Sequence, residues 1–126
     1  MNNMKKLLLL LFSLTLSFNS YGDCWEEYLK DVPSNNFENT IKICTPLAQN
    51  GDVWSQETLG GMYYGIKNYK EAFKWTKKAA MQGFASSQFR LGFAYELGEG
   101  TLKDYKQAVN WYRKSAEQGN TAAQNN

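Results

Sequence analysis

Apolar side chains recur at steps of three and four residues in 69–83, which is the spacing of one buried face of an amphipathic helix. The residues that share this face are Tyr69, Ala72, Phe73, Thr76, Ala79 and Ala80. The pattern returns 36 residues later in 105–119, and a weaker copy lies 32 residues earlier in 37–51. The sequence therefore predicts three amphipathic helices of similar length.

A second motif precedes two of these helices. The pattern S-Q-x-x-L-G-x-x-Y occurs at residues 55–63 and again 32 residues later, at 87–95. A repeat period in the thirties is typical of arrays built from one small supersecondary unit. Each unit is expected to consist of two antiparallel helices. The predicted fold is all-α, a short α-solenoid of antiparallel helix pairs.

Polar residues and glycines mark the ends of the predicted second helices. An asparagine or aspartate stands just before each apolar face, where its side-chain oxygen can accept a hydrogen bond from a free backbone N–H. These residues are Asn36, Asn68 and Asp104. The same helices are expected to end at glycines that adopt the left-handed conformation, namely Gly51, Gly83 and Gly119. Two further glycines, Gly60 and Gly92, lie inside the predicted first helices and indicate close approach between helices.

Together these motifs resemble the Sel-one-like repeat (SLR), a relative of the tetratricopeptide repeat. The closest match is in residues 84–119, where L-G-x-x-Y, G-x-G and D-Y-x-x-A-x-x-W-Y-x-K-S-A-x-x-G follow one another from Leu91 to Gly119. Residues 52–83 also match, although a short connection, 65–68, replaces the longer G-x-G connection. The resemblance implies a curved stack of helix pairs that serves as a protein-binding scaffold, in a family that no catalytic residue defines.

The repeats divide the chain into five segments. We expect residues 1–22 to be a signal peptide and residues 23–51 to be an N-terminal capping helix pair tied by a disulfide. Residues 52–83 and 84–119 are the two complete repeats that the resemblance implies. Residues 120–126 are expected to be an incomplete repeat or a tail.

The N-terminal segment has the pattern of a secretory signal. Lys5 and Lys6 precede an apolar stretch, residues 7–18, that is too short to span a bilayer. Ser20 and Gly22 supply the small residues that a cleavage site needs. Cleavage after Gly22 predicts a periplasmic or secreted protein with no stable membrane anchor.

Removal of this segment also removes the apparent basicity of the chain. The full chain carries 14 Lys and Arg against 12 Asp and Glu, and two of the lysines belong to the signal, so the mature protein is formally neutral. Lys74, Lys77 and Lys78 form the densest basic cluster and are interpreted as a solvated helix face. No nucleic-acid partner is expected.

Export also bears on the two cysteines, because the compartment beyond the inner membrane is oxidising. Cys24 and Cys44 are expected to form a disulfide that stabilises the fold by roughly 3 kcal/mol. Two buried thiols and a redox pair are the alternatives, and the lack of a C-x-x-C spacing weighs against the redox pair.

The residues for catalysis and for metal binding are scarce. The chain has no histidine and two cysteines, so it lacks the commonest general base and cannot supply a zinc site of His and Cys ligands. Glu96 and Glu99 are interpreted as solvated loop acids, because no histidine or basic residue lies nearby in the sequence. We therefore expect no catalytic residue, no cofactor and no metal.

Positions at which the two repeats differ are candidates for binding specificity. Phe89 and Phe93 stand where the earlier repeat has Glu57 and Gly61. Two phenylalanines one turn apart, beside an arginine, suit a protein-binding patch; the alternative is that they pack against the neighbouring unit and fill the space left by Gly61. The candidate protein-binding residues are Phe89, Arg90, Phe93, Met62 and Tyr64.

The sequence thus predicts an exported helical-repeat scaffold that binds another protein as an adaptor or immunity-type module. One alternative is a cysteine-rich SLR relative that binds or hydrolyses penicillin, although those relatives carry a cysteine pair in each repeat and residues 52–126 have none. The other alternative is a fragment of a longer SLR array. A further unit would normally cover the outer side of the C-terminal helix. We expect this helix to dock on another chain or on a second copy of itself (self-association), unless the gene is a truncated copy.

Overall fold

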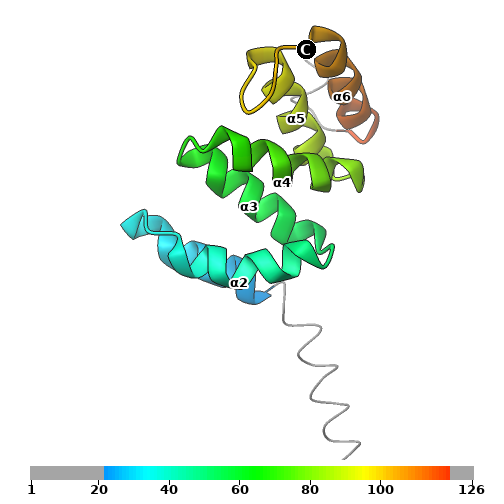
Figure 1. Cartoon of the computed structure of the whole chain (residues 1–126). Coiled ribbons are helices and arrows are strands. Elements are labelled where there is room, and N and C mark those ends of the chain that lie inside the picture. The colour runs from blue at the N-terminus through cyan, green and yellow to red at the C-terminus, as the bar shows by residue number, and fades with distance from the viewer. Residues whose placement is uncertain (1–21, 120–126) are drawn as a thin grey trace, which may run out of the picture.

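The computed structural model describes residues 22–119, which form three antiparallel helix pairs stacked in chain order (Figure 1). The first pair consists of residues 22–31 and α2 (Glu38–Gln49), with a short 3-10 turn, η1 (Val32–Ser34), between them. The second pair is α3 (Val53–Gly65) and α4 (Tyr69–Met81), and the third is α5 (Ala85–Leu97) and α6 (Tyr105–Glu117). The predicted all-α solenoid of helix pairs is confirmed.

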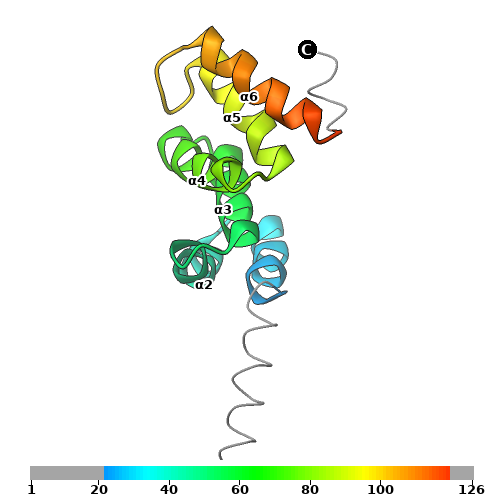
Figure 2. The ribbon, with the colours of Figure 1, turned by 90° about the vertical axis from the view of Figure 1, so that its right-hand side faces the viewer.

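From α2 onward, each helix packs on the next one along the chain, both within a pair and between pairs. Figure 2, turned by 90° from Figure 1, shows α5 and α6 running side by side as one such pair. The expected signal peptide (apart from Gly22) and the expected incomplete repeat at 120–126 lie outside the described residues. Within 22–119, no helix is long and apolar enough to cross a membrane.

The predicted caps of the second helices are confirmed at two of three positions. The side chains of Asn68 and Asp104 accept hydrogen bonds from the backbone N–H groups three residues later, at 3.4 and 3.0 Å. Asn36 differs, because α2 starts one residue later than predicted, with Phe37 at its N-cap. Asn36 instead accepts a bond from the backbone N–H of Glu38, at 3.2 Å.

Glycines permit close contact between the two helices of a pair, as the sequence predicted. A Cβ atom added at Gly60 of α3 would lie 2.6 Å from Thr76 Oγ1 and 3.2 Å from Thr76 N in α4. At the equivalent Gly92, a Cβ would lie 2.8 Å from the ring of Tyr112. A larger residue would therefore force the two helices of each pair apart.

Buried glutamines connect one pair to the next. Gln56 of α3 donates a hydrogen bond from Nε2 to the carbonyl of Ala48, in the last turn of α2, at 2.9 Å. Gln88 of α5 does the same to the carbonyl of Ala80 in α4, at 3.3 Å. These two carbonyls also accept bonds from the backbone N–H groups of Gly51 and Gly83, at 3.1 and 3.0 Å. Each glutamine therefore adds a bond from the neighbouring pair to a carbonyl at the end of a helix.

The first pair is held by a covalent bond as well as by packing. Cys24 and Cys44 are joined in a disulfide, and both are fully buried. Beside them, Tyr28 stacks on Phe37 with ring centroids 5.9 Å apart. The buried carboxylate of Asp31 accepts hydrogen bonds from the backbone N–H and the hydroxyl of Thr40, at 2.9 and 2.7 Å. The predicted Cys24–Cys44 pairing is therefore present.

We expect Gly60→Ala to destabilise the protein by about 1–3 kcal/mol, because the new methyl group would collide with Thr76 in the adjacent helix. Gly65→Ala in the same helix is the control, since a methyl group added there would meet nothing within 4 Å. Urea unfolding followed by circular dichroism measures both. Equal midpoints for the two variants would contradict the close approach.

Candidate protein-binding groove

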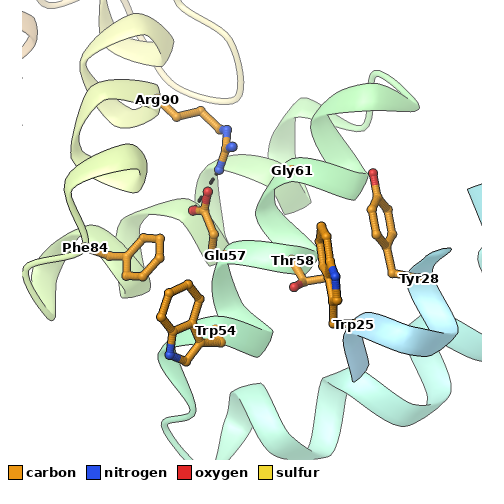
Figure 3. Close-up of a pocket in the computed structure, with 8 residues that line it drawn as sticks. All are labelled: Trp25, Tyr28, Trp54, Glu57, Thr58, Gly61, Phe84 and Arg90. Atoms are coloured by element: carbon orange, nitrogen blue, oxygen red, sulfur yellow. Dashed lines mark hydrogen bonds and ion pairs between the residues drawn. The ribbon is translucent and has the colours of Figure 1, made fainter. Parts of the chain in front are cut away.

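The first helices of the three pairs share a cavity of about 420 Å³. Its walls come from residues 22–31, from α3 and from the start of α5, which the close-up in Figure 3 shows together. The principal lining residues are Trp25, Tyr28, Trp54, Glu57, Phe84 and Arg90. Because the walls belong to three different pairs, the cavity exists only in the stacked array.

Aromatic rings form two sides of this cavity. Trp25 and Tyr28 lie on one side with ring centroids 5.4 Å apart, and Trp54 meets Phe84 edge-on at 4.7 Å on the other (Figure 3). Trp25 is 42% exposed and Trp54 is 46% exposed. Large aromatic side chains that remain accessible at a concave site are typical anchors for a partner.

A polar cluster joins α3 to α5 at the edge of the cavity. Glu57 accepts hydrogen bonds from the hydroxyls of Ser86 and Ser87, and Arg90 Nη1 lies 2.9 Å from Glu57 Oε2. Both members of this ion pair are partly buried. The guanidinium also lies beside Gly61, since Arg90 Nη2 is 3.6 Å from the position of a Cβ there. Arg90 is thus held in place from the neighbouring pair.

A second cavity, of about 300 Å³, adjoins the first and shares Arg90 with it. It is lined by Tyr64, Ser86, Phe89, Arg90 and Phe93. The structure therefore brings together four of the five residues that the sequence analysis selected. We refer to the two cavities together as the aromatic groove.

The space beside Gly61 is occupied by Arg90, and the phenylalanine Phe89 lies elsewhere. The ring of Phe89 packs on Tyr112 of its own pair, with ring centroids 5.3 Å apart.

Met62 corrects the candidate list. Its side chain is only 2% exposed and belongs to the core cluster that contains Leu59 and Trp75. Met62 and Tyr64 are two residues apart on a helix, so they point in different directions. Met62 is therefore part of the core and is not available to a partner.

The interpretation of Glu96 and Glu99 as solvated acids is also wrong. Glu96 accepts a hydrogen bond from the hydroxyl of Tyr112 at 2.5 Å. Glu99 lies between two left-handed glycines, Gly98 and Gly100, and its Oε2 atom is buried with no hydrogen-bond partner among the described residues. Burial, and then the negative charge of Glu99, raise the pKa of Tyr64. The G-x-G connection thus turns Glu99 towards the protein.

Sequence reasoning selected Arg90 but missed the aromatic residues of the larger cavity. Trp25 and Trp54 stood outside the repeat comparison, and Tyr28 lies in the segment that matches the repeat least. A signal was available at Phe84, which occupies the position of Asp52 in the preceding repeat. Asp52 caps its helix by accepting a hydrogen bond from Ser55 N, and Phe84 makes no such bond. An aromatic residue at an N-cap position, where a polar side chain is usual, indicates that Phe84 has a role other than starting the helix.

Within residues 22–119, no group of three or more His, Cys, Asp or Glu side chains could hold a metal ion. The aromatic groove presents aromatic rings, the guanidinium of Arg90, the carboxylate of Glu57 and hydroxyl groups.

Comparison with known proteins places the chain in a family. The Sel1 repeat model matches residues 57–84 and 85–120, and the chain belongs to the Sel1-repeat family. Sel1 repeats generally form non-catalytic scaffolds, and Sel1-repeat proteins generally bind other proteins. No curated protein matches the chain significantly.

Two solved structures resemble this one. The first is c5321, a protective antigen present in uropathogenic Escherichia coli strains and displaying an SLR fold, with 38% identity and a TM-score of 0.74. That match covers 87% of this chain but 25% of c5321, so the chain spans about a quarter of its relative. The second is a Sel1 repeat protein from Oxalobacter formigenes, with 29% identity, a TM-score of 0.70 and coverage of 89% and 93% of the two chains.

The Tyr112–Glu96 bond has a consequence at alkaline pH. Burial and the bond to Glu96 raise the pKa of Tyr112 well above its ordinary value. A raised pKa in the folded state contributes stability below the unfolded pKa of about 10, and this stability is lost as the pH rises further. We expect Tyr112→Phe to lower the free energy of unfolding by about 1–2 kcal/mol near pH 7, because the bond to Glu96 is lost. We also expect the stability of this variant to fall less steeply than that of the wild type above a pH of about 10.

Urea unfolding near pH 7 and above a pH of about 10 tests this expectation. Tyr105→Phe is the control, because Tyr105 is 65% exposed. The same alkaline decline in the wild-type protein and in Tyr112→Phe would contradict the assignment.

Proposed function

We propose that the protein is an exported scaffold that binds a segment of another protein in the aromatic groove. The observation that carries the proposal is the position of Arg90, which lines both cavities while Glu57 holds it at 2.9 Å. An arginine fixed before binding loses little side-chain entropy when a partner arrives. Its remaining N–H groups can donate to carbonyl or carboxylate oxygens of the partner.

The residues on either side of Arg90 supply the apolar contacts. Trp25 and Trp54 would hold one anchor side chain of the partner in the larger cavity. Phe89 and Phe93, with Tyr64, would hold a second anchor in the smaller cavity. Trp, Tyr and Arg are the residue types that most often dominate binding energy at protein interfaces. An adaptor or an immunity-type protein would use such a groove in the same way.

Export of the protein forms part of this proposal. Residues 1–22 have the composition of a secretory signal, and the buried Cys24–Cys44 disulfide is compatible with an oxidising compartment. The signal-like segment and the disulfide both support the proposal that the protein binds its partner in the periplasm or outside the cell.

The aromatic groove can be tested without a known partner by selecting binding peptides from a displayed random library. We expect Trp54→Ala and Phe93→Ala each to weaken binding of a selected peptide by about tenfold or more, which corresponds to about 1.4 kcal/mol. Isothermal titration calorimetry gives the affinities. Leu102→Ala is the control, because Leu102 is 87% exposed and lines neither cavity.

Undiminished affinity in both groove variants would show that the selected peptides bind elsewhere. Circular dichroism of each variant separates a loss of contact from a loss of fold.

Self-association through α6 is a second proposal, supported by the exposure of its apolar side chains. Tyr105 is 65% exposed and Val109 is 53% exposed, whereas the equivalent Tyr69 and Phe73 are partly covered by the following pair. We expect Val109→Asp to lower the weight-average mass at high protein concentration, because it places a charge in the contact. Light scattering makes the measurement, and a wild-type protein that stays monomeric would contradict this proposal.

A further inference from the structure

Charge is divided unevenly between the two helices of each pair. The second helices, α2, α4 and α6, carry eight Lys and Arg against three Glu. The first helices, which are residues 22–31, α3 and α5, carry two basic and six acidic side chains. The described residues therefore have a basic side, formed by the second helices, and an acidic side that includes the aromatic groove.

The basic side chains of α4 and α6 are largely without acidic partners. Within the described part of the chain, the one ion pair that involves these two helices joins Lys74 to Glu71 at 3.6 Å. The others are exposed, and no acidic side chain of residues 22–119 lies within ion-pair distance of them. They are Lys70, Lys77, Lys78, Lys106, Arg113 and Lys114. Unpaired charges of one sign attract a ligand of the opposite sign.

Two of these lysines line a cavity of about 470 Å³ between the second and third pairs. We call this cavity the basic groove, and its principal residues are Lys77, Met81, Tyr95, Gln107, Trp111 and Lys114. The ammonium group of Lys114 lies 4.4 Å from the ring centroid of Trp111, and that of Lys77 lies 5.9 Å from the ring of Phe73. The aromatic rings thus hold both cations near the groove and leave their charge unneutralised.

We propose that the basic groove binds an acidic segment of a protein partner, in extended conformation. Carboxylates of the segment would pair with Lys77 and Lys114, and its apolar side chains would contact Met81 and Trp111. Gln107 adds an amide that can bond to the peptide backbone. This site is separate from the aromatic groove, and it needs no occupant there.

The side chains that line the basic groove favour a peptide over an anionic membrane. A membrane surface is broad and would engage Lys70, Lys78 and Lys106 as readily as the two lysines of the groove. A groove that combines two cations with an indole ring and an amide suits a segment that alternates acidic and apolar side chains.

The test uses protein expressed from the full chain and a short fluorescein-labelled peptide of alternating glutamate and leucine. A second peptide, with glutamine in place of glutamate, controls for charge. We expect Lys77→Gln/Lys114→Gln to weaken binding of the acidic peptide by about tenfold in fluorescence anisotropy. Raising the salt from about 50 mM to about 300 mM should weaken the wild-type complex as well.

Lys70→Gln/Lys106→Gln is the matched control, since it removes the same charge from exposed positions outside the groove. We expect it to weaken binding by no more than about twofold. Equal losses in the two double variants would overturn the proposal in favour of unspecific attraction, as would equal affinity for the glutamine peptide. Failure to bind the acidic peptide, with groove-dependent binding to phosphatidylglycerol vesicles, would overturn it in favour of a membrane.

The aromatic groove remains intact in both double variants, because neither pair of lysines lines it. A peptide selected for the aromatic groove should bind both variants with unchanged affinity. The two proposals can therefore fail independently.

Discussion

The stack depends on a hydrogen bond that crosses from each helix pair to the one before it. Gln56 and Gln88 are almost fully buried, and each donates to a carbonyl in the last turn of the preceding pair. The same side chains accept from Gln82 and Gln118, at 2.8 and 2.7 Å. A buried amide that lost these partners would be costly, so the network favours the observed spacing between pairs. That spacing sets the walls of the aromatic groove, which come from three pairs.

Much of the fold could be predicted because it is encoded by local repetition. The helical periodicity, the caps at Asn68 and Asp104 and the glycines at Gly60 and Gly92 all correspond to features of the structure. The error at Asn36 is a shift of one residue, because the side chain of Asn36 accepts a bond from the first residue of α2, Glu38, while Phe37 stands at the N-cap. Local side-chain bonds of this kind resemble a cap in the sequence.

The site was less predictable, because it depends on distances between pairs. Phe89, Arg90 and Phe93 could be found, since they depart from the repeat and lie on one helix. Trp25 and Trp54 are far apart in the sequence, and only stacking places them around one cavity. Residue type and spacing alone also cannot tell a buried position from an accessible one, which explains the error at Met62. Glu96 and Glu99 were misjudged because their tyrosine partners, Tyr112 and Tyr64, come from other helices.

The disulfide makes the two ends of the described stack unequal. In a linear array each pair contacts only its neighbours, so segments can open locally without the whole molecule unfolding. The crosslink between Cys24 and Cys44 restricts such opening in the first pair and leaves the third pair without a covalent restraint. Amide protons of α5 and α6 will therefore exchange with solvent sooner than those around the disulfide. Of the aromatic side chains that line the groove, Trp25 and Tyr28 are therefore the ones that stand on the covalently restrained pair.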